Sequence, residues 1–221
     1  QRFLASASKL LGSSLDVETT LSRAAATAVP QLADWCRVDL LDEHERLIPA
    51  ALAHPEDAPD EHVRLARGAA RLDRSDPRSP WHVIDGGRPI VINDIPGMLR
   101  ETGLGDERQV ALANTLDLRS IAIVPMTAGE RTVGILTLAT GPSGRRIGAP
   151  EVTLAMELGR RAGIAVDHAR VHATSRYIAE TLQHSLLPRR LPDIPGTTMA
   201  PRFRAAGEGA EVGGDFYDAF P

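Results

Sequence analysis

Residues 151–187 read EVTLAMELGRRAGIAVDHARVHATSRYIAETLQHSLL, and this stretch decides how the rest of the chain is interpreted. Its apolar residues recur at steps of three and four, the spacing of an amphipathic helix. They are Leu154, Leu158, Ala162, Ala165, Ala169, Ile178, Leu182 and Leu186. Pro150 suits the first turn of a helix, and Pro188 ends one. At roughly 1.5 Å per residue, about 38 residues predict a rod of about 57 Å. We expect a helix of this length to join two bodies or to pair with a second chain, as a transmission element.

The composition is that of an ordinary globular protein, with 43% hydrophobic and 24% charged residues among 221. Its net charge of −4 gives no bulk attraction to nucleic acid or to anionic membranes. The single cysteine, Cys36, excludes an internal disulfide and fits a reducing compartment, so we expect a cytoplasmic protein. No apolar run reaches the roughly 18 residues that would predict a membrane span. Because the chain starts at Gln1 and stops at Pro221, we expect a fragment of a longer protein.

Upstream of the long helix, the first third of the chain predicts two helices followed by two strands. Residues 2–12 read as a helix, and Asp16 is placed to cap the next one. The apolar stripe predicted for that second helix is Val17, Leu21, Ala24, Ala25 and Ala28. Beyond Pro30, apolar residues 36, 38 and 40 alternate with Arg37 and Asp39, which predicts a strand buried on one face. Residues 47–53 read as its partner strand.

The middle of the chain predicts short helices, one further strand and a strong hairpin. A helix is expected around residues 61–72, and residues 79–94 read as a short helix, a Gly86-Gly87 turn and a strand. Residues 98–118 are mixed helix and loop. The apolar runs at 120–126 and 132–139 predict two antiparallel strands joined by a short loop. The order predicts an α+β fold with a mostly antiparallel sheet flanked by its terminal helices.

Residues 5–170 resemble a GAF domain, a bacterial small-molecule or signal sensor. The segments that carry the resemblance are ADWCRVDLLDE (33–43), GGRPIVIND (86–94), SIAIVPM (120–126) and GERTVGILTLAT (129–140). The resemblance implies a ligand pocket, and the residues from pocket-lining segments are Trp81, His82, Asp94, Met98 and Arg119. Core packing explains Trp81 and Met98 equally well. No cyclic-nucleotide signature is present, so the ligand stays unnamed.

The last forty residues resemble a different family, the SpoIIE-like branch of PPM-type serine/threonine phosphatases. The matching segments are LQHSLLPRRLPDIPG (182–196) and RFRAAGEGAEVGGDFYD (202–218). The resemblance implies Mn²⁺ or Mg²⁺ that generates an attacking hydroxide, and hard cations of this kind prefer carboxylate ligands. By the same resemblance, Asp215 is the first acidic metal ligand and Asp218 a second candidate. The family's other ligands would follow Pro221, so we expect this chain alone to be inactive.

Together the two resemblances predict three parts: a GAF-like sensor at 1–149, a connecting helix at 150–188 and the truncated start of a phosphatase at 189–221. They imply a signalling phosphatase whose substrate is a phosphorylated anti-sigma-factor antagonist. We expect a parallel homodimer, joined through its long helices, that binds neither nucleic acid nor membrane. The alternative is a GAF module for small-ligand binding or dimerisation without catalysis.

Several other patterns favour structural interpretations. Cys36 could tether a chromophore, but its place on the apolar face of a strand favours a core residue. His168 and His172 are spaced i, i+4 and could share a metal, although solvent-exposed helix histidines are more common. A histidine kinase would carry a phosphoacceptor histidine on the long helix, and the LQHSLLP context of His184 argues against that function.

Overall fold

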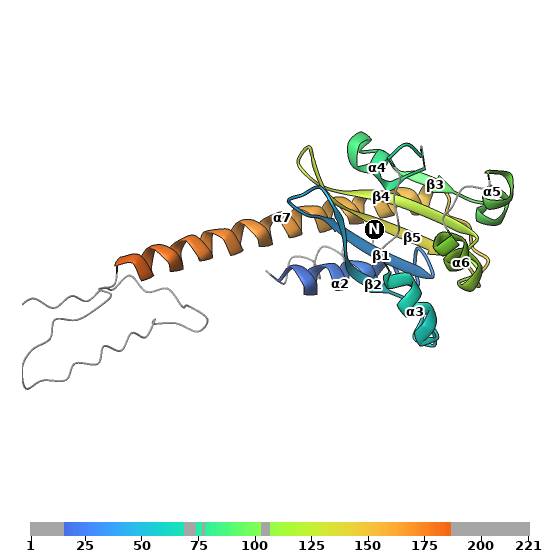
Figure 1. Ribbon diagram of the computed structural model, residues 1–221, viewed down its shortest axis with the longest axis horizontal. Helices are drawn as coiled ribbons and strands as arrows, with labels where there is room; N and C mark the ends of the chain where they lie inside the picture. Colours follow the sequence, from blue (N-terminus) through green and yellow to red (C-terminus); the bar gives the residue numbers. More distant parts are fainter. Residues whose placement is uncertain (1–15, 69–73, 77, 103–106, 187–221) are drawn as a thin grey trace, which may run out of the picture. The chain divides into compact units, whose positions relative to one another are not determined.

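The computed structural model of the chain describes residues 16–68, 74–76, 78–102 and 107–186 (Figure 1). The helix expected at 2–12 lies outside the described residues, as do Asp215 and Asp218 with the whole segment after residue 186. The chain divides into two compact units, with the boundary between Ala169 and Arg170. The first unit therefore takes in the first 21 residues of the long helix, 149–169, together with the sheet.

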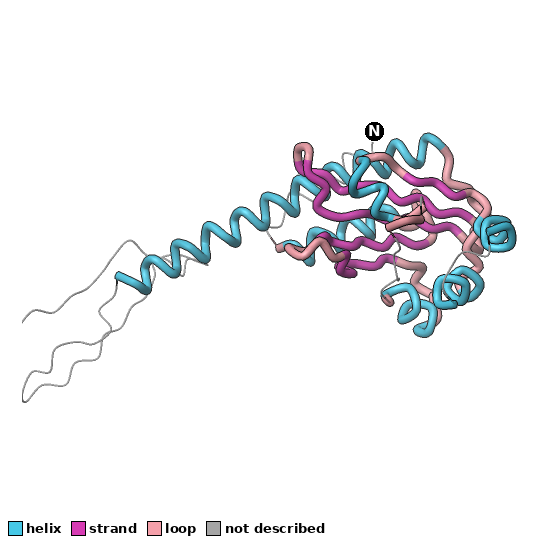
Figure 2. The backbone as a smooth tube through the Cα atoms, turned by 45° about the horizontal axis from the view of Figure 1, so that its top comes forward, coloured by secondary structure: helices cyan, strands magenta, loops and turns pink. Residues whose placement is uncertain are grey.

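The first unit holds the sheet and its covering helices. Its strands are β1 (Trp35–Leu41), β2 (Leu47–Ala53), β3 (Ile90–Ile92), β4 (Ser120–Ala128) and β5 (Arg131–Thr140). The helices of the described residues are α2 (Val17–Ala28), α3 (Asp60–Arg67), α4 (Pro80–Gly86), α5 (Ile95–Thr102), α6 (Glu107–Thr115) and α7 (Ala149–Leu186). The strand order is β2-β1-β5-β4-β3, and every neighbouring pair is antiparallel. Figure 2 shows the strands side by side, with helices around them. The predicted α+β class is confirmed.

Sequence signals explain where these elements begin and end. The Asp16 carboxylate accepts a hydrogen bond from the Thr19 backbone N–H at 2.7 Å, which makes it the N-cap predicted for α2. Pro80 occupies the first turn of α4, and Gly87 ends that helix in the left-handed conformation with φ 62°. Gly129 has the same φ in the tight turn between β4 and β5. Caps and turns are therefore the part of this fold that local residues determine.

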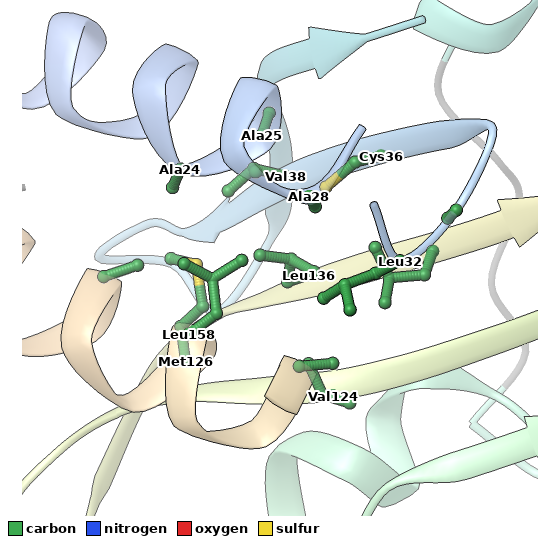
Figure 3. Close-up of a cluster of buried hydrophobic side chains, with 14 of the residues drawn as sticks. Ala24, Ala25, Ala28, Leu32, Cys36, Val38, Val124, Met126, Leu136 and Leu158 are labelled. Atoms are coloured by element: carbon green, nitrogen blue, oxygen red, sulfur yellow. The ribbon is translucent and has the colours of Figure 1, made fainter. Parts of the chain in front are cut away.

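One face of the sheet packs against α2 and the first part of α7. Side chains from both helices and from β1, β4 and β5 meet there in one apolar cluster (Figure 3). Its largest fully buried members are Leu21, Val38, Val124, Met126, Val133, Leu136, Leu138, Ile147, Leu158 and Val166. We call this the first face of the sheet.

The second face is covered by the four short helices α3 to α6. One cluster gathers Trp35 and Ala139 of the sheet with residues of α3, α5 and α6. A smaller cluster gathers Ile123 and Ile135 of the sheet with Val83 of α4. The prediction that β1 is buried on one face only was wrong, because these helices cover its other face and leave Asp39 only 4% exposed.

The long helix confirms one prediction and qualifies another. A single helix runs from Ala149 to Leu186, close to the predicted bounds. Its predicted apolar stripe is buried at Leu158, Ala162 and Ala169. Farther along, however, Ile178 and Leu182 are 51% and 59% exposed, so the predicted stripe does not continue as a buried surface. In the part of the chain that the structure describes, no helix is long and apolar enough to cross a membrane.

Candidate functional site

A row of polar side chains crosses the middle of the second face, where an apolar core would be expected. Three neighbouring β1–β5 pairs define its place: Trp35–Ala139, Arg37–Thr137 and Asp39–Ile135. Because side chains alternate between the faces of a strand, all six residues share one face. The outer pair at Trp35 belongs to one apolar cluster, and Ile135 belongs to the other. We call Arg37, Asp39 and Thr137 the polar row. It lies between Trp35 and Ile135 on this face, whereas Ile121 of β4 packs against both clusters.

The guanidinium of Arg37 holds this row together and ties it to α3. Its Nε lies 2.9 Å from both carboxylate oxygens of Asp39, and its Nη2 donates to Oδ1 at 2.6 Å. Its Nη1 donates to the carbonyl oxygens of Ala66 at 3.1 Å and Gly68 at 2.6 Å. Carbonyl groups at the end of a helix have no partner within that helix, so a cation placed there satisfies them.

The chemistry of this arrangement is that of binding. A guanidinium presents planar N–H groups that match carboxylates, phosphates and amide oxygens. The side chains of Arg37 and Asp39 are 19% and 6% exposed, so the pair is held where water screens its charges weakly. An anionic group that reached this face would compete with Asp39 for Arg37 and disturb the end of α3. The polar row therefore joins strand β1 to the end of α3.

Sequence reasoning missed the polar row because alternation in a strand was taken to mean a solvent-exposed face. The signal that could have found it lies elsewhere in the sequence. Short helices predicted at 61–72 and 79–86 have to pack against something, and the second face of the sheet is the surface left for them. Charged residues on a strand covered from both sides are then candidates for a paired, buried site.

Two of the five predicted ligand residues lie next to each other on α4. Trp81 is half-buried, and the guanidinium carbon of Arg74 lies 4.1 Å from the centre of its ring. That guanidinium also forms an ion pair with Glu45 at 3.4 Å, which holds the cation over the aromatic face. His82 is exposed to solvent.

The other three predicted residues gather at the start of α5. The Asp94 carboxylate accepts from the Gly97 backbone N–H at 2.9 Å, which caps this helix. Met98 is half-buried against the cluster around Trp35. The carbonyl of Arg119 accepts from the Ile95 N–H at 3.1 Å, and its exposed guanidinium pairs with Asp117 at 2.7 Å. The structure thus places the five residues in two groups, one on α4 and one around the first turn of α5.

The single cysteine belongs to the first face. Cys36 is fully buried in the apolar cluster between α2, α7 and the sheet. Burial raises the pKa of its thiol, because the thiolate would lose its hydration. A thiol that is inaccessible and protonated is a poor nucleophile. Cys36 is therefore a core residue, as its alternation predicted, and is unsuited to tethering a chromophore.

A second polar site, also missed from the sequence, fastens the segment that leads into α7. The Asp34 carboxylate accepts from the Gly141 N–H at 2.8 Å, from the Ser143 hydroxyl at 2.7 Å and from the Arg145 guanidinium at 3.1 Å. Burial alone would raise the pKa of Asp34, but the hydrogen bonds from Ser143, Gly141 and Arg145 outweigh it and hold this pKa below its ordinary value. We call these four residues the Asp34 clasp.

The metal ligands implied by the phosphatase resemblance, Asp215 and Asp218, lie outside the described residues. Within the described ranges, no three His, Cys, Asp or Glu side chains come close enough together to hold a metal ion. His168 and His172 accordingly gather no third such ligand there. The polar row is thus the best-supported candidate site in the described part of the chain.

Comparison with known proteins agrees with this architecture. A family model described as "GAF domain" matches residues 14–167. No curated protein matches the chain significantly. Among solved structures, the GAF domain of a phosphoenolpyruvate-protein phosphotransferase from Coxiella burnetii is 15% identical with a TM-score of 0.60, over 78% of this chain and 95% of that one.

Two further structures carry pigments or absorb light according to their descriptions. The blue-light absorbing form of the Thermosynechococcus elongatus PixJ GAF domain is 21% identical with a TM-score of 0.54, over 76% of this chain and 94% of that one. A far-red absorbing dark state with bound biliverdin IXα is 15% identical with a TM-score of 0.53, over 76% and 99%. At these identities the likeness shows the fold alone.

Proposed function

The chain belongs to the GAF domain family, and from this premise we propose that it is the sensory part of a bacterial signalling phosphatase. In this proposal the second face of the sheet receives a signal, and α7 carries it to a metal-dependent serine/threonine phosphatase that begins near residue 189. The substrate class is a phosphorylated anti-sigma-factor antagonist, a protein whose dephosphorylation releases a sigma factor.

The observation that carries this proposal is the continuity of α7. One helix begins at Ala149, next to the sheet, and ends at Leu186, inside the segment 182–196 that resembles the phosphatase family. A helix transmits displacement along its axis better than a loop does, because each residue is hydrogen-bonded to the next turn. The proposal rests in addition on the sequence resemblance between residues 180–221 and the start of the phosphatase family.

The chemistry proposed for the output domain depends on residues in that segment. Asp215 would hold a Mn²⁺ or Mg²⁺ ion, with Asp218 as a second candidate, because carboxylate oxygens suit hard cations. A metal held there would supply a hydroxide at neutral pH for attack on the phosphoryl group. Gly213 and Gly214 precede Asp215, and residues without side chains would leave room for water beside the carboxylate.

The test is an activity measurement on a chain extended through the expected catalytic domain. We expect Mn²⁺-dependent release of phosphate from a phosphorylated anti-sigma-factor antagonist, and loss of that release in Asp215→Asn. Asp193→Asn is the matched control, because Asp193 lies in the same tail but outside the metal motif. Absence of Mn²⁺-dependent release, or full activity in Asp215→Asn, would refute the phosphatase proposal.

A second candidate function, a ligand-binding module without catalysis, is favoured by the polar row. A structural relative contains bound biliverdin IXα, and we propose that the same face of this chain receives a small ligand without a covalent bond. Native mass spectrometry of the purified chain tests this, with Arg37→Gln as the variant. We expect a bound small molecule whose retention falls in Arg37→Gln. Purification of a ligand-free chain from several hosts would count against this function.

Both candidate functions fit a homodimer, and we propose one that is parallel and joined through α7. A helix transmits a signal by shifting relative to a neighbouring structure. In a parallel pair, each helix is the neighbour against which the other one shifts. Sedimentation of the chain at rising concentration measures this directly. A chain that stays monomeric at the highest soluble concentration would contradict it.

A further inference from the structure

The helix α7 carries two stripes of side chains on opposite sides. The first lies against the sheet and is buried; it consists of Ala155, Leu158, Ala162, Val166 and Ala169. We call it the buried stripe. Ile164 lies two residues from both Ala162 and Val166, which is about 200° around a helix with 3.6 residues per turn. Ile164 therefore begins a separate stripe on the far side of α7 from the sheet.

That second stripe follows steps of four and three along the helix. Its members are Ile164, His168, Val171, Ser175, Ile178 and Leu182, and we call it the heptad stripe. An average step of 3.5 residues is the repeat that keeps one line of side chains facing a partner helix in a left-handed coiled coil. Val171, Ile178 and Leu182 are 58%, 51% and 59% exposed. Large apolar residues placed in this repeat and left exposed indicate an interface.

We infer that the heptad stripe is the docking surface for a second copy of this chain, parallel and in register. The inference rests on the proposed dimer and adds the face of α7 that forms it. It also replaces the single stripe expected from the sequence, because the buried stripe is already occupied by the sheet. With the buried stripe against the sheet and the heptad stripe exposed, α7 can pack on its own sheet and on a second copy of α7 at the same time.

The residues beside the heptad stripe favour a second copy over an unrelated charged partner. The flanking positions are Ala165, Asp167, His172, Thr174, Ala179 and Thr181. Small and neutral residues predominate there, so two copies meet without repulsion between like charges. In a parallel pair, residues 167 and 174 each face the residue five positions later in the other helix, so Asp167 meets His172 and Thr174 meets Ala179. Asp167 is also ion-paired with Arg131 of its own chain, so neither pair brings like charges together.

The polar members of the heptad stripe explain why the pairing would be in register and weak. In a parallel pair, His168 meets His168 of the other copy, and Ser175 meets Ser175. Polar residues at such core positions lower stability and fix register. The 19 residues from 164 to 182 span only about 28 Å. We therefore expect a dimer weaker than standard interfaces, which bury about 800 Å² per partner.

Cross-linking tests the geometry, because the natural Cys36 is fully buried and stays silent. Ile178→Cys places a thiol on the heptad stripe of the 221-residue chain. We expect a disulfide-linked dimer under mild oxidation. Ala173→Cys is the matched control, because Ala173 is exposed but five residues, and so about 140°, away around the helix. Equal cross-linking at both positions would overturn the assigned face.

A pair of charge substitutions tests the energetics. Ile178→Glu places a charge in the heptad stripe, whereas Tyr177→Glu places it on the neighbouring residue, which is even more exposed at 68%. By sedimentation equilibrium we expect Ile178→Glu to weaken the dimer by at least about tenfold and Tyr177→Glu to leave it nearly unchanged. A dimer that withstands Ile178→Glu overturns the heptad stripe but leaves the proposed dimer intact, whereas a wild-type monomer removes both. Neither result depends on phosphatase activity, which is measured separately.

Discussion

The first face of the sheet is one continuous apolar cluster under α2 and α7. The second face holds two clusters that share Ile121, with Arg37 and Asp39 beside them on β1. The first arrangement resists rearrangement, because close-packed apolar side chains have no alternative partners of equal energy. The second arrangement can exchange partners, since hydrogen bonds of Arg37 to Asp39 and to the end of α3 can be replaced by bonds to a ligand. The contrast teaches that one face attaches the long helix and the other is suited to recognition.

Close backbone approach strengthens the attachment of α7 to the first face. A Cβ added at Gly163 would collide with the backbone of Thr127, and one added at Gly159 would lie 2.5 Å from the carbonyl oxygen of Pro125. Arg131 at the start of β5 also forms an ion pair with Asp167 of α7. The β4–β5 hairpin and α7 therefore touch directly, so a displacement of the hairpin reaches the helix without an intervening loop.

Gly163→Ala is the substitution expected to have the largest effect, because it breaks this contact on the first face. The added methyl group clashes with backbone atoms that cannot rotate away, so we expect the free energy of unfolding to fall by about 2 kcal/mol or more. Gly86→Ala is the control, since nothing lies within 4 Å of a Cβ there. Urea denaturation measures both. A Gly163→Ala protein as stable as Gly86→Ala would show that α7 is attached less closely than described.

On the second face, Asp39→Ala is expected to cost about 2–4 kcal/mol, because it leaves the half-buried guanidinium of Arg37 without its charge partner. Arg37→Ala should also destabilise, and the double substitution should cost less than the sum of the two. Chemical denaturation of the three variants completes the cycle. If the losses in the free energy of unfolding were additive, Arg37 and Asp39 would not stabilise the fold as a pair. The second face would then not differ from the first in having a coupled polar pair.

Asp34→Asn is expected to cost about 1–2 kcal/mol at neutral pH, since the clasp loses hydrogen bonds to a charged acceptor. The pKa of Asp34 is lowered in the folded state. Its carboxylate therefore stabilises the fold above the unfolded pKa of about 3.9, and this contribution is lost as the pH falls from there through the lower folded value. Between pH 6 and pH 2, the free energy of unfolding should fall less steeply with decreasing pH in Asp34→Asn than in the unsubstituted protein. Asp117→Asn, at an exposed ion pair, is the control.

The parts of the fold that could be predicted are those governed by neighbours in sequence. Apolar repeats marked the strands and α7, Asp16 marked the start of α2, and Gly87 marked the end of α4. These signals are local, because caps and turns depend on a few adjacent residues. The fold class followed from the order of the elements.

The candidate sites could not be predicted in the same way, because their partners are distant in sequence. Arg37 bonds to Gly68, 31 residues later, and Asp34 bonds to residues 107 to 111 positions away. Strand alternation tells which residues share a face, but it does not tell what covers that face. The sequence likewise does not tell that the missing side chain of Gly163 is what lets α7 approach Thr127.

The smallest expected effect sharpens the comparison, because it concerns an ion pair on the more exposed surface of α7. Glu157 accepts hydrogen bonds from Arg160 and from Arg161, and these two arginines lower the pKa of its carboxyl to about 2. Its stabilising contribution is present above the unfolded pKa and is lost as the pH falls from about 4.3 through about 2. Water screens these charges, so Glu157→Gln should cost only about 0.3–0.5 kcal/mol at neutral pH, and less at high salt. Denaturation at two salt concentrations measures this, with Asp39→Ala as the comparison. Suppose that Glu157→Gln lowered the free energy of unfolding as much as Asp39→Ala does. Burial would then not distinguish the Arg37–Asp39 pair from a surface ion pair, and the polar row would no longer be supported as a candidate site.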